Sequence, residues 1–191
     1  MSFILASGSP RRRELLASLG IDFRVIKSDL DETQRPGEAP LAYVRRLSIE
    51  KASAVAASAP PDALILAADT VVIHQGEILG KPADAADARA MLTRLRDQAH
   101  TVCTALTLLN PPAPPLTQLT QTEVVMRAYT DDEIEAYIAT GDPFDKAGGY
   151  AIQHEGFHPV AHIVGSYTNV VGLPLETLKA MLIEVGYDLP E

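Results

Sequence analysis

Several residue types are scarce in this chain of 191 residues, and each scarcity excludes a class of protein. There is no tryptophan and only 5% of the residues are aromatic, so the core has to consist of Leu, Val, Ile and Ala. The single cysteine, Cys103, excludes an intramolecular disulfide and fits a reducing compartment. No apolar run reaches membrane-spanning length, and the first residues lack a signal-peptide pattern. We therefore expect a cytoplasmic protein with no membrane partner.

Basic residues are outnumbered as well, because 16 Lys and Arg stand against 25 Asp and Glu, a formal charge of −9. A general nucleic-acid binder needs a basic face, and a single-strand binder needs aromatic stacking platforms, so neither is expected. The balance still permits a small phosphate ligand that is held by a local group of arginines.

The length and the apolar content of 47% suit one α/β domain over residues 1–191, with two lobes around one cleft. Apolar runs bounded by turn residues predict strands at Phe3–Ala6, Phe23–Ile26, Leu64–Ile73, His100–Leu109, Leu116–Arg127, Tyr150–Gln153 and His158–Val164. Helical patterns predict helices at Pro10–Leu19, Pro40–Ala57, Asp84–Arg96, Thr130–Ala139 and from Pro174 to before Gly186. Some strands alternate with helices and others follow one another directly, which predicts a mixed sheet with flanking helices.

The most informative stretch is Leu5–Leu16, which reads LASGSPRRRELL. Ser9 suits an N-cap and Pro10 suits the first helical position, so a helix should begin at the tip of the first strand. The free N–H groups and the positive dipole end of such a helix form an anion site. Arg11 and Arg12 lie on it, and guanidinium groups match phosphate oxygens. We expect a ligand that carries phosphate to bind at this turn.

One carboxylate, Asp69, interrupts the apolar run from 64 to 73. A charge in such a run is costly unless it is paired, hydrogen-bonded or bound to metal. Asp69 could simply cap the strand end, but ligands gather at strand ends in open α/β sheets, so a metal ligand or general base is favoured. The acidic segment 28–37, which includes Glu32, could donate further oxygens to Mg²⁺ or could be an ordinary surface loop.

Other candidates carry weaker signals. Lys81, between a glycine and a proline, has a restricted direction that suits a phosphate contact, although an exposed lysine has the same pattern. Lys51 on the long second helix carries the same alternative. The glycine-rich loop Asp145–Tyr150 permits close backbone approach to a ligand, and Gln153 could read a base edge or simply face solvent.

Familiar catalytic motifs are missing from the sequence. There is no P-loop, no G-x-S-x-G elbow and no H-E-x-x-H pair. The histidines have no spacing to the cysteine that matches a zinc site.

Five blocks, in this order, resemble the Maf family of nucleoside triphosphate pyrophosphatases, and the resemblance covers nearly the whole chain. They lie at Leu5–Leu16, Tyr43–Ala52, Ala68–Pro82, Thr140–Gln153 and Gly165–Pro174. The resemblance implies an elongated α/β fold with a deep central cleft, similar to the inosine-triphosphate pyrophosphatases. It implies cleavage between the α and β phosphates, a divalent cation (Mg²⁺, with Mn²⁺ as the alternative) and a homodimer. The fourth block is similar to the branch that acts on dTTP and UTP.

The resemblance also assigns roles. In that branch the aspartate that matches Asp69 is regarded as the proton acceptor, and the residues that match Arg11, Thr70 and Gln153 as specificity determinants. Residues that match Arg12, Lys51 and Lys81 lie at the polyphosphate. The complete set of expected substrate-binding residues is Ser7, Ser9, Arg11, Arg12, Lys51, Thr70, Lys81, Lys146 and Gln153. The expected metal ligands are Asp69 and Glu32, and whether Asp69 is chiefly the base or chiefly a ligand stays open.

Alternatives to dTTP and UTP hydrolysis remain. The same reaction could act on modified pyrimidine nucleotides, 7-methyl-GTP or another non-standard nucleotide. A non-catalytic nucleotide sensor that regulates division could use the same pocket. Asp69 together with both lysines and the arginine turn favours the enzyme, since sensing needs no carboxylate that activates water.

Overall fold

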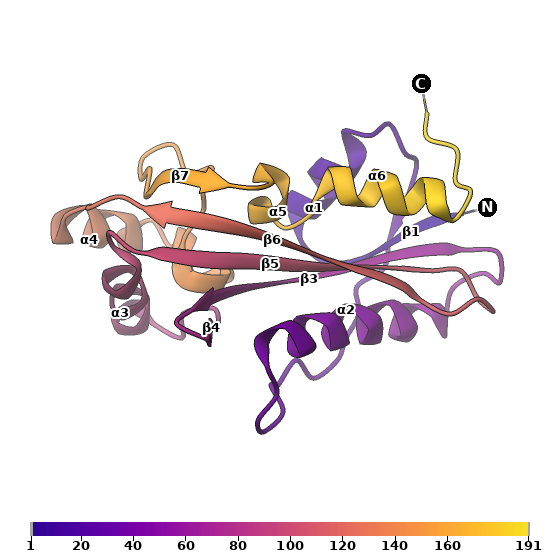
Figure 1. Cartoon of the computed structure of the whole chain (residues 1–191), viewed down its shortest axis with the longest axis horizontal. Helices are drawn as coiled ribbons and strands as arrows, with labels where there is room; N and C mark the ends of the chain where they lie inside the picture. The colour runs from indigo at the N-terminus through magenta and orange to yellow at the C-terminus, as the bar shows by residue number, and fades with distance from the viewer. Residues whose placement is uncertain (1, 191) are drawn as a thin grey trace.

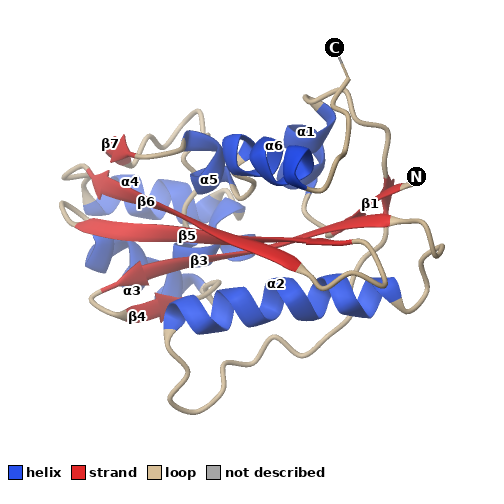
Figure 2. Ribbon diagram, turned by 45° about the vertical axis from the view of Figure 1, so that its right-hand side comes forward, coloured by secondary structure: helices blue, strands red, loops and turns tan. Residues whose placement is uncertain are grey.

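The computed structural model describes residues 2–190. Within these residues, seven strands form one mixed sheet that helices cover on both faces (Figures 1 and 2). The strands are β1 (Phe3–Ala6), β2 (Arg24–Val25), β3 (Leu64–His74), β4 (Glu77–Leu79), β5 (Ala99–Leu109), β6 (Leu116–Met126) and β7 (Val160–Val164). The helices are α1 (Pro10–Ala17), α2 (Pro40–Ala56), α3 (Ala85–Leu95), α4 (Asp131–Ala139), α5 (Tyr167–Val171) and α6 (Leu175–Glu184), with 3₁₀ turns η1 (Asp142–Asp145) and η2 (Ala147–Gly149).

The sheet has the strand order β2-β1-β3-β5-β6-β7, with β4 beside β3. The pairs β2–β1 and β1–β3 are parallel, and the other pairs are antiparallel. The predicted mixed sheet with flanking helices is therefore confirmed.

Alternate residues of β3 pack against helices on opposite faces, as the two-residue period of a strand requires. Leu64 and Leu66 share a core with α1 and α6. Ile65 and Ala67 share a different core with α2, which lies alone along the other face in Figure 2. Burial on both faces explains why β3 reads as a continuous apolar run.

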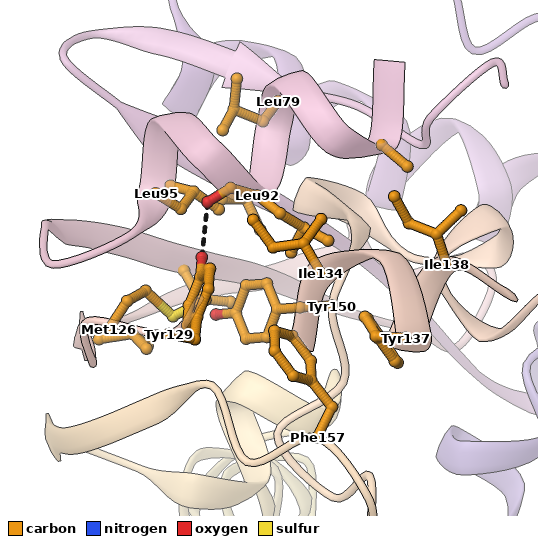
Figure 3. Packing of buried hydrophobic residues seen from close by; sticks show 14 residues of the cluster. Leu79, Leu92, Leu95, Met126, Tyr129, Ile134, Tyr137, Ile138, Tyr150 and Phe157 are labelled. Atoms are coloured by element: carbon orange, nitrogen blue, oxygen red, sulfur yellow. Dashed lines mark hydrogen bonds between the residues drawn. The ribbon is translucent and has the colours of Figure 1, made fainter. Parts of the chain in front are cut away.

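A third core lies at the far end of the sheet, between α3, α4 and the ends of β5 and β6 (Figure 3). The Tyr129 hydroxyl donates to the Leu92 carbonyl at 2.6 Å. Tyr137 and Phe157 stack with their ring centroids 4.5 Å apart. Tyrosines concentrate here because their hydroxyls find partners inside the core.

The strand predicted over Tyr150–Gln153 is wrong. Gly148 and Gly149 take φ values of +72° and +70°, and the chain continues as an irregular turn. The Ala151 N–H donates to the Tyr137 hydroxyl at 3.1 Å, so it is not available to a neighbouring strand.

Other predicted elements differ at their ends. The first helix ends at Ala17, because positive φ at Gly20 follows a short turn. Only two residues of the second predicted strand pair, as β2, and the last strand begins at Val160. Helix α5 was not predicted, although Ser166 caps its start and Gly172 ends it in the left-handed conformation.

Buried His100 predicts a pH-dependent stability. It is 4% exposed, its Nε2 lies 2.7 Å from the Tyr150 hydroxyl, and burial lowers its pKa to about 4. The unfolded chain takes up this proton near pH 6.5, so stability that is present above pH 6.5 is lost as the pH falls toward 4. We expect urea denaturation to show that His100→Gln removes roughly 2 kcal/mol of the loss between pH 7 and pH 4.5.

His162, which is exposed on β7, provides the control. His162→Gln makes the same side-chain change outside the core and shows what the substitution alone does to the free energy of unfolding. Parallel profiles for the wild type and His100→Gln would contradict the assignment.

Candidate functional site

The cleft lies beside a stretch of β3 whose edge has no neighbouring strand among residues 2–190. On this edge β1 pairs with Leu64–Ala67 and β4 pairs with Val72–His74, while β5 covers the opposite edge. Residues 68–71 therefore face a gap, which opens because β1 ends at Ala6 and the chain turns into α1. A cavity of about 420 Å³ lies at this gap.

Every residue proposed for the site from the sequence lines this one cavity. They are Ser7, Ser9, Arg11, Arg12, Glu32, Lys51, Asp69, Thr70, Lys81, Lys146 and Gln153. They come from α1, α2, β3 and four separate connecting segments, so only the fold brings them together.

The start of α1 has the predicted local structure. Ser9 is the N-cap and its side chain accepts from the Arg12 N–H at 3.4 Å, and Pro10 follows at the first helical position. The Ser9 N–H donates to the Ser7 hydroxyl at 3.2 Å, which tightens the turn. This geometry presents the positive end of the α1 dipole to the cavity.

Arg12 is a structural clamp at the unpaired edge of β3. Its guanidinium donates to the Ala68 carbonyl at 2.8 Å, to the Thr70 hydroxyl at 2.9 Å and to the Gly172 carbonyl at 2.9 Å. The Ala68 carbonyl would otherwise lack a strand partner. Arg12 therefore replaces part of a missing strand and ties α1 to the end of α5.

Thr70 continues this network into the sheet. Its hydroxyl lies 2.9 Å from the Thr104 hydroxyl, which donates to the Asn169 carbonyl at 3.2 Å. Because the single hydrogen of the Thr104 hydroxyl is used for the Asn169 carbonyl, Thr104 has to accept from Thr70. Thr70 therefore accepts from Arg12 and donates to Thr104. Its hydroxyl hydrogen is thus directed into the protein and holds the clamp in place.

Asp69 points to the α2 side, where Lys51 reaches it. The Lys51 ammonium lies 2.6 Å from Asp69 Oδ1 and 2.8 Å from Glu32 Oε1. Burial raises the pKa of Asp69 above its usual value, although Lys51 and Arg12 act to lower it. Asp69 Oδ2 has no hydrogen-bond partner among residues 2–190 and remains for a ligand.

Lys146 is also occupied by protein partners. Its ammonium donates to the Asp142 carbonyl at 2.7 Å, to the Asp142 carboxylate at 2.8 Å and to the Asp145 carboxylate at 2.6 Å. An ammonium has three donors, so these contacts use all of them. Within residues 2–190, Arg11 makes a single long contact, 3.5 Å to Asp145, and keeps most of its donors.

The glycine pair before Tyr150 permits the close approach of this loop to β3. A Cβ on Gly148 would lie 3.1 Å from the Val72 side chain, and one on Gly149 would lie 3.0 Å from Pro82. Positive φ at both positions favours glycine further. The Gly148 N–H donates to the Gly80 carbonyl at 2.9 Å, which brings the Lys81 and Lys146 segments together.

Two candidates keep free polar groups at the cavity. Lys81 and Gln153 are exposed, and the side chain of neither makes a hydrogen bond or ion pair with a residue in 2–190. Tyr150 also lines the cavity and was not proposed from the sequence as a site residue. Its place directly after two glycines was the one sequence signal that could have pointed to it. The hydrogen bond that holds it, to buried His100, joins residues 50 positions apart and has no local pattern.

The described residues contain no cluster of three or more His, Cys, Asp or Glu side chains that could hold a metal by themselves. The carboxylates of Asp69 and Glu32 both contact the Lys51 ammonium and therefore lie close together. Such a pair could hold Mg²⁺, because this ion takes one or two carboxylates and completes its shell with substrate phosphates. No helix within residues 2–190 combines the length and apolar character needed to cross a membrane.

Comparisons with known proteins identify close relatives. A model of the family of Maf-like proteins matches residues 2–185. The dTTP/UTP pyrophosphatase of Myxococcus xanthus is 50% identical and the one of Chromobacterium violaceum is 46% identical. These matches cover 98% and 97% of this chain and 94% and 96% of those proteins.

Solved structures show the same fold at low sequence identity. The Staphylococcus aureus Ham1 protein aligns with a TM-score of 0.55 at 13% identity, covering 97% of this chain and 100% of that one. A HAM1 protein from Coxiella burnetii also aligns at 0.55, with 16% identity, covering 96% and 99%.

The clamp role of Arg12 predicts a stability effect. Arg12→Lys removes the forked donors and leaves carbonyls of Ala68 and Gly172 without partners, so the unfolding free energy should fall by roughly 2 kcal/mol. Arg11→Lys is the matched control on the same helix and should cost under about 0.5 kcal/mol. Equal unfolding free energies for the two variants in urea would show that Arg12 holds nothing together.

Proposed function

The chain belongs to the family of Maf-like proteins, and from this premise we propose that it hydrolyses dTTP and UTP to the nucleoside monophosphate and pyrophosphate. The observation that carries the chemistry is Asp69, a buried carboxylate held by Lys51 in the cavity at the start of α1. The names of the close relatives supply the substrates.

The triphosphate lies across the Ser7–Arg12 turn. The start of α1 supplies backbone N–H groups, and Arg11 and Lys81 supply positive charge. In the described part of the chain Lys81 makes no ion pair and Arg11 makes one, at 3.5 Å. Fixed donors and cations of this kind stabilise the charge that develops during phosphoryl transfer. Arg12 and Lys146 act behind them, since their donors already bind the protein.

The uracil or thymine ring lies toward Gln153. Its amide has a donor and an acceptor, and both are needed to pair with the N3–H and O4 edge that uracil and thymine share. Cytosine reverses this pattern, so an amide held in the orientation that fits uracil would meet donor with donor and acceptor with acceptor, which costs about 1–3 kcal/mol.

Asp69 holds the attacking water and accepts its proton. Lys51 occupies Oδ1 and keeps the carboxylate oriented, so Oδ2 is the oxygen that binds water on the side of the α-phosphorus. A fixed carboxylate with a raised pKa is a better proton acceptor than an ordinary aspartate.

A divalent cation, Mg²⁺ or Mn²⁺, would be held by Asp69 and Glu32 together with substrate phosphates. When bound, it would offset the negative charge of the triphosphate. We further propose that residues 1–191 act as one domain with two lobes around the cleft. The homodimer and the cytoplasmic location stay predictions.

A panel of nucleoside triphosphates with Mg²⁺ tests the function. We expect UTP and dTTP to yield pyrophosphate, with CTP slower by about tenfold or more because of the Gln153 mismatch. Release of orthophosphate alone would mean a different class of hydrolase, and equal rates on CTP would refute the role of Gln153.

Asp69→Asn tests the proton acceptor in the same assay. The amide cannot accept the proton, so turnover should fall by roughly a thousandfold. Asp132→Asn, at an exposed position of α4, is the control and should retain full activity. Wild-type turnover in Asp69→Asn would remove the basis of the mechanism.

Lys51 contacts Asp69 and Glu32, the two carboxylates proposed to hold the metal. We therefore expect the Lys51 ammonium and the metal ion to compete for these carboxylates. Without nucleotide, Lys51→Met should bind Mn²⁺ about tenfold more tightly than the wild type, because the ammonium no longer neutralises Asp69 and Glu32. Electron paramagnetic resonance of free Mn²⁺ measures this directly. Lys81→Met is the control, and unchanged affinity in Lys51→Met would exclude these carboxylates as the metal ligands.

A further inference from the structure

Gln153 lies on a loop that has no helix or strand to hold it. Residues 151–157 form an irregular turn, and the exposed Gln153 side chain has no hydrogen-bond partner among residues 2–190. A base-reading amide has to be held in place before the ligand arrives, or ordering the loop reduces the affinity. Another residue of the loop must therefore fix its shape.

His154 makes the contacts that fix this loop. Its Nδ1 lies 3.1 Å from the Gly156 nitrogen and 2.8 Å from the Phe157 nitrogen, and both backbone N–H groups donate to it. Two N–H donors that converge on Nδ1 need a lone pair there, which the Nε2–H tautomer of the imidazole supplies. The His154 N–H also donates to the Ala151 carbonyl at 3.4 Å, which closes the turn around Gln153.

Tyr137 of α4 contacts the same loop at several points. The His154 ring meets the Tyr137 ring edge-on, with centroids 4.8 Å apart. The Tyr137 hydroxyl accepts from the Ala151 N–H at 3.1 Å and donates to the Asp142 carboxylate at 2.9 Å. Phe157 stacks on Tyr137 in Figure 3, so the start, the middle and the end of the loop all rest on one buried tyrosine.

A second hollow makes this support necessary. It has a volume of about 420 Å³ and adjoins the main cavity, and Gln153 and His154 line it. Gln153 stands between the two spaces and has room to turn away from a bound base. The charged side chains that face His154 across this hollow are Arg11, Asp142, Lys146 and Glu155.

We propose that His154 is a positioning residue for pyrimidine recognition: its neutral ring holds the 151–157 loop so that Gln153 faces the main cavity. This inference rests on the proposed function, in which Gln153 pairs with uracil or thymine. His154 touches no reacting atom, and its effect passes through Gln153.

Steady-state kinetics with UTP and CTP test the inference. His154→Ala should raise KM for UTP about tenfold, keep kcat within about twofold, and reduce the UTP-over-CTP preference by a similar factor. His154→Asn should restore KM to within about threefold, because its side-chain oxygen can accept from N–H groups two residues further on. His158→Ala, at an exposed histidine nearby, is the control and should change nothing.

A double-mutant cycle separates positioning from a general structural effect. In a Gln153→Ala background, His154→Ala should change KM by less than about twofold, since the residue it positions is gone. A full tenfold change in that background would overturn the inference, as would a His154→Asn variant as impaired as His154→Ala.

The imidazole itself gives a readout that needs no variant to fold. ¹⁵N spectra of the wild type at neutral pH should show His154 as the neutral Nε2–H tautomer with a hydrogen-bonded Nδ1. An Nδ1–H tautomer would overturn the inference even where UTP is hydrolysed normally. Absence of turnover by the wild type on every nucleotide would instead overturn the proposed function, and the inference with it.

Discussion

The site depends on one constraint: among residues 2–190, β3 has no strand partner at positions 68–71 along the edge that β1 and β4 share. A buried strand edge must satisfy its polar groups, and here side chains do so in place of backbone. Arg12 donates to the backbone carbonyl of Ala68 at this edge. Beside it, Lys51 donates to the side-chain carboxylate of Asp69 from the α2 side. The interruption of the sheet thus creates both the cavity and the charge that surrounds it.

Local chemistry explains what could be predicted from the sequence. The start of α1 was predictable because Ser9 and Pro10 affect only the first turn of the helix, where Ser9 accepts from the Arg12 N–H. Asp69 stood out because a carboxylate in an apolar run needs a partner. The resemblance of the five blocks to one family predicted that the candidate residues share a single cleft, and they do line one cavity. The distances between their side chains could not be predicted, because they depend on the pairing of strands that are far apart in the sequence.

Long-range partners explain what could not be predicted. Arg12 was expected at the polyphosphate and Lys146 among the substrate-binding residues. Arg12 instead donates to Gly172, 160 residues away, and Lys146 donates to Asp142 and Asp145. The segment after Gly149 reads as a strand by its apolar residues. It is a turn because its first N–H donates to a tyrosine of α4, a contact with no local signal.

The central claim is that Asp69 Oδ2 holds a water molecule against the α-phosphorus. Hydrolysis of UTP in H₂¹⁸O tests this most directly, because the label enters the phosphorus that water attacks. The account predicts one ¹⁸O in UMP and none in the pyrophosphate. Label in the pyrophosphate would mean attack at the β-phosphorus, and the arrangement around Asp69 would then need a different explanation.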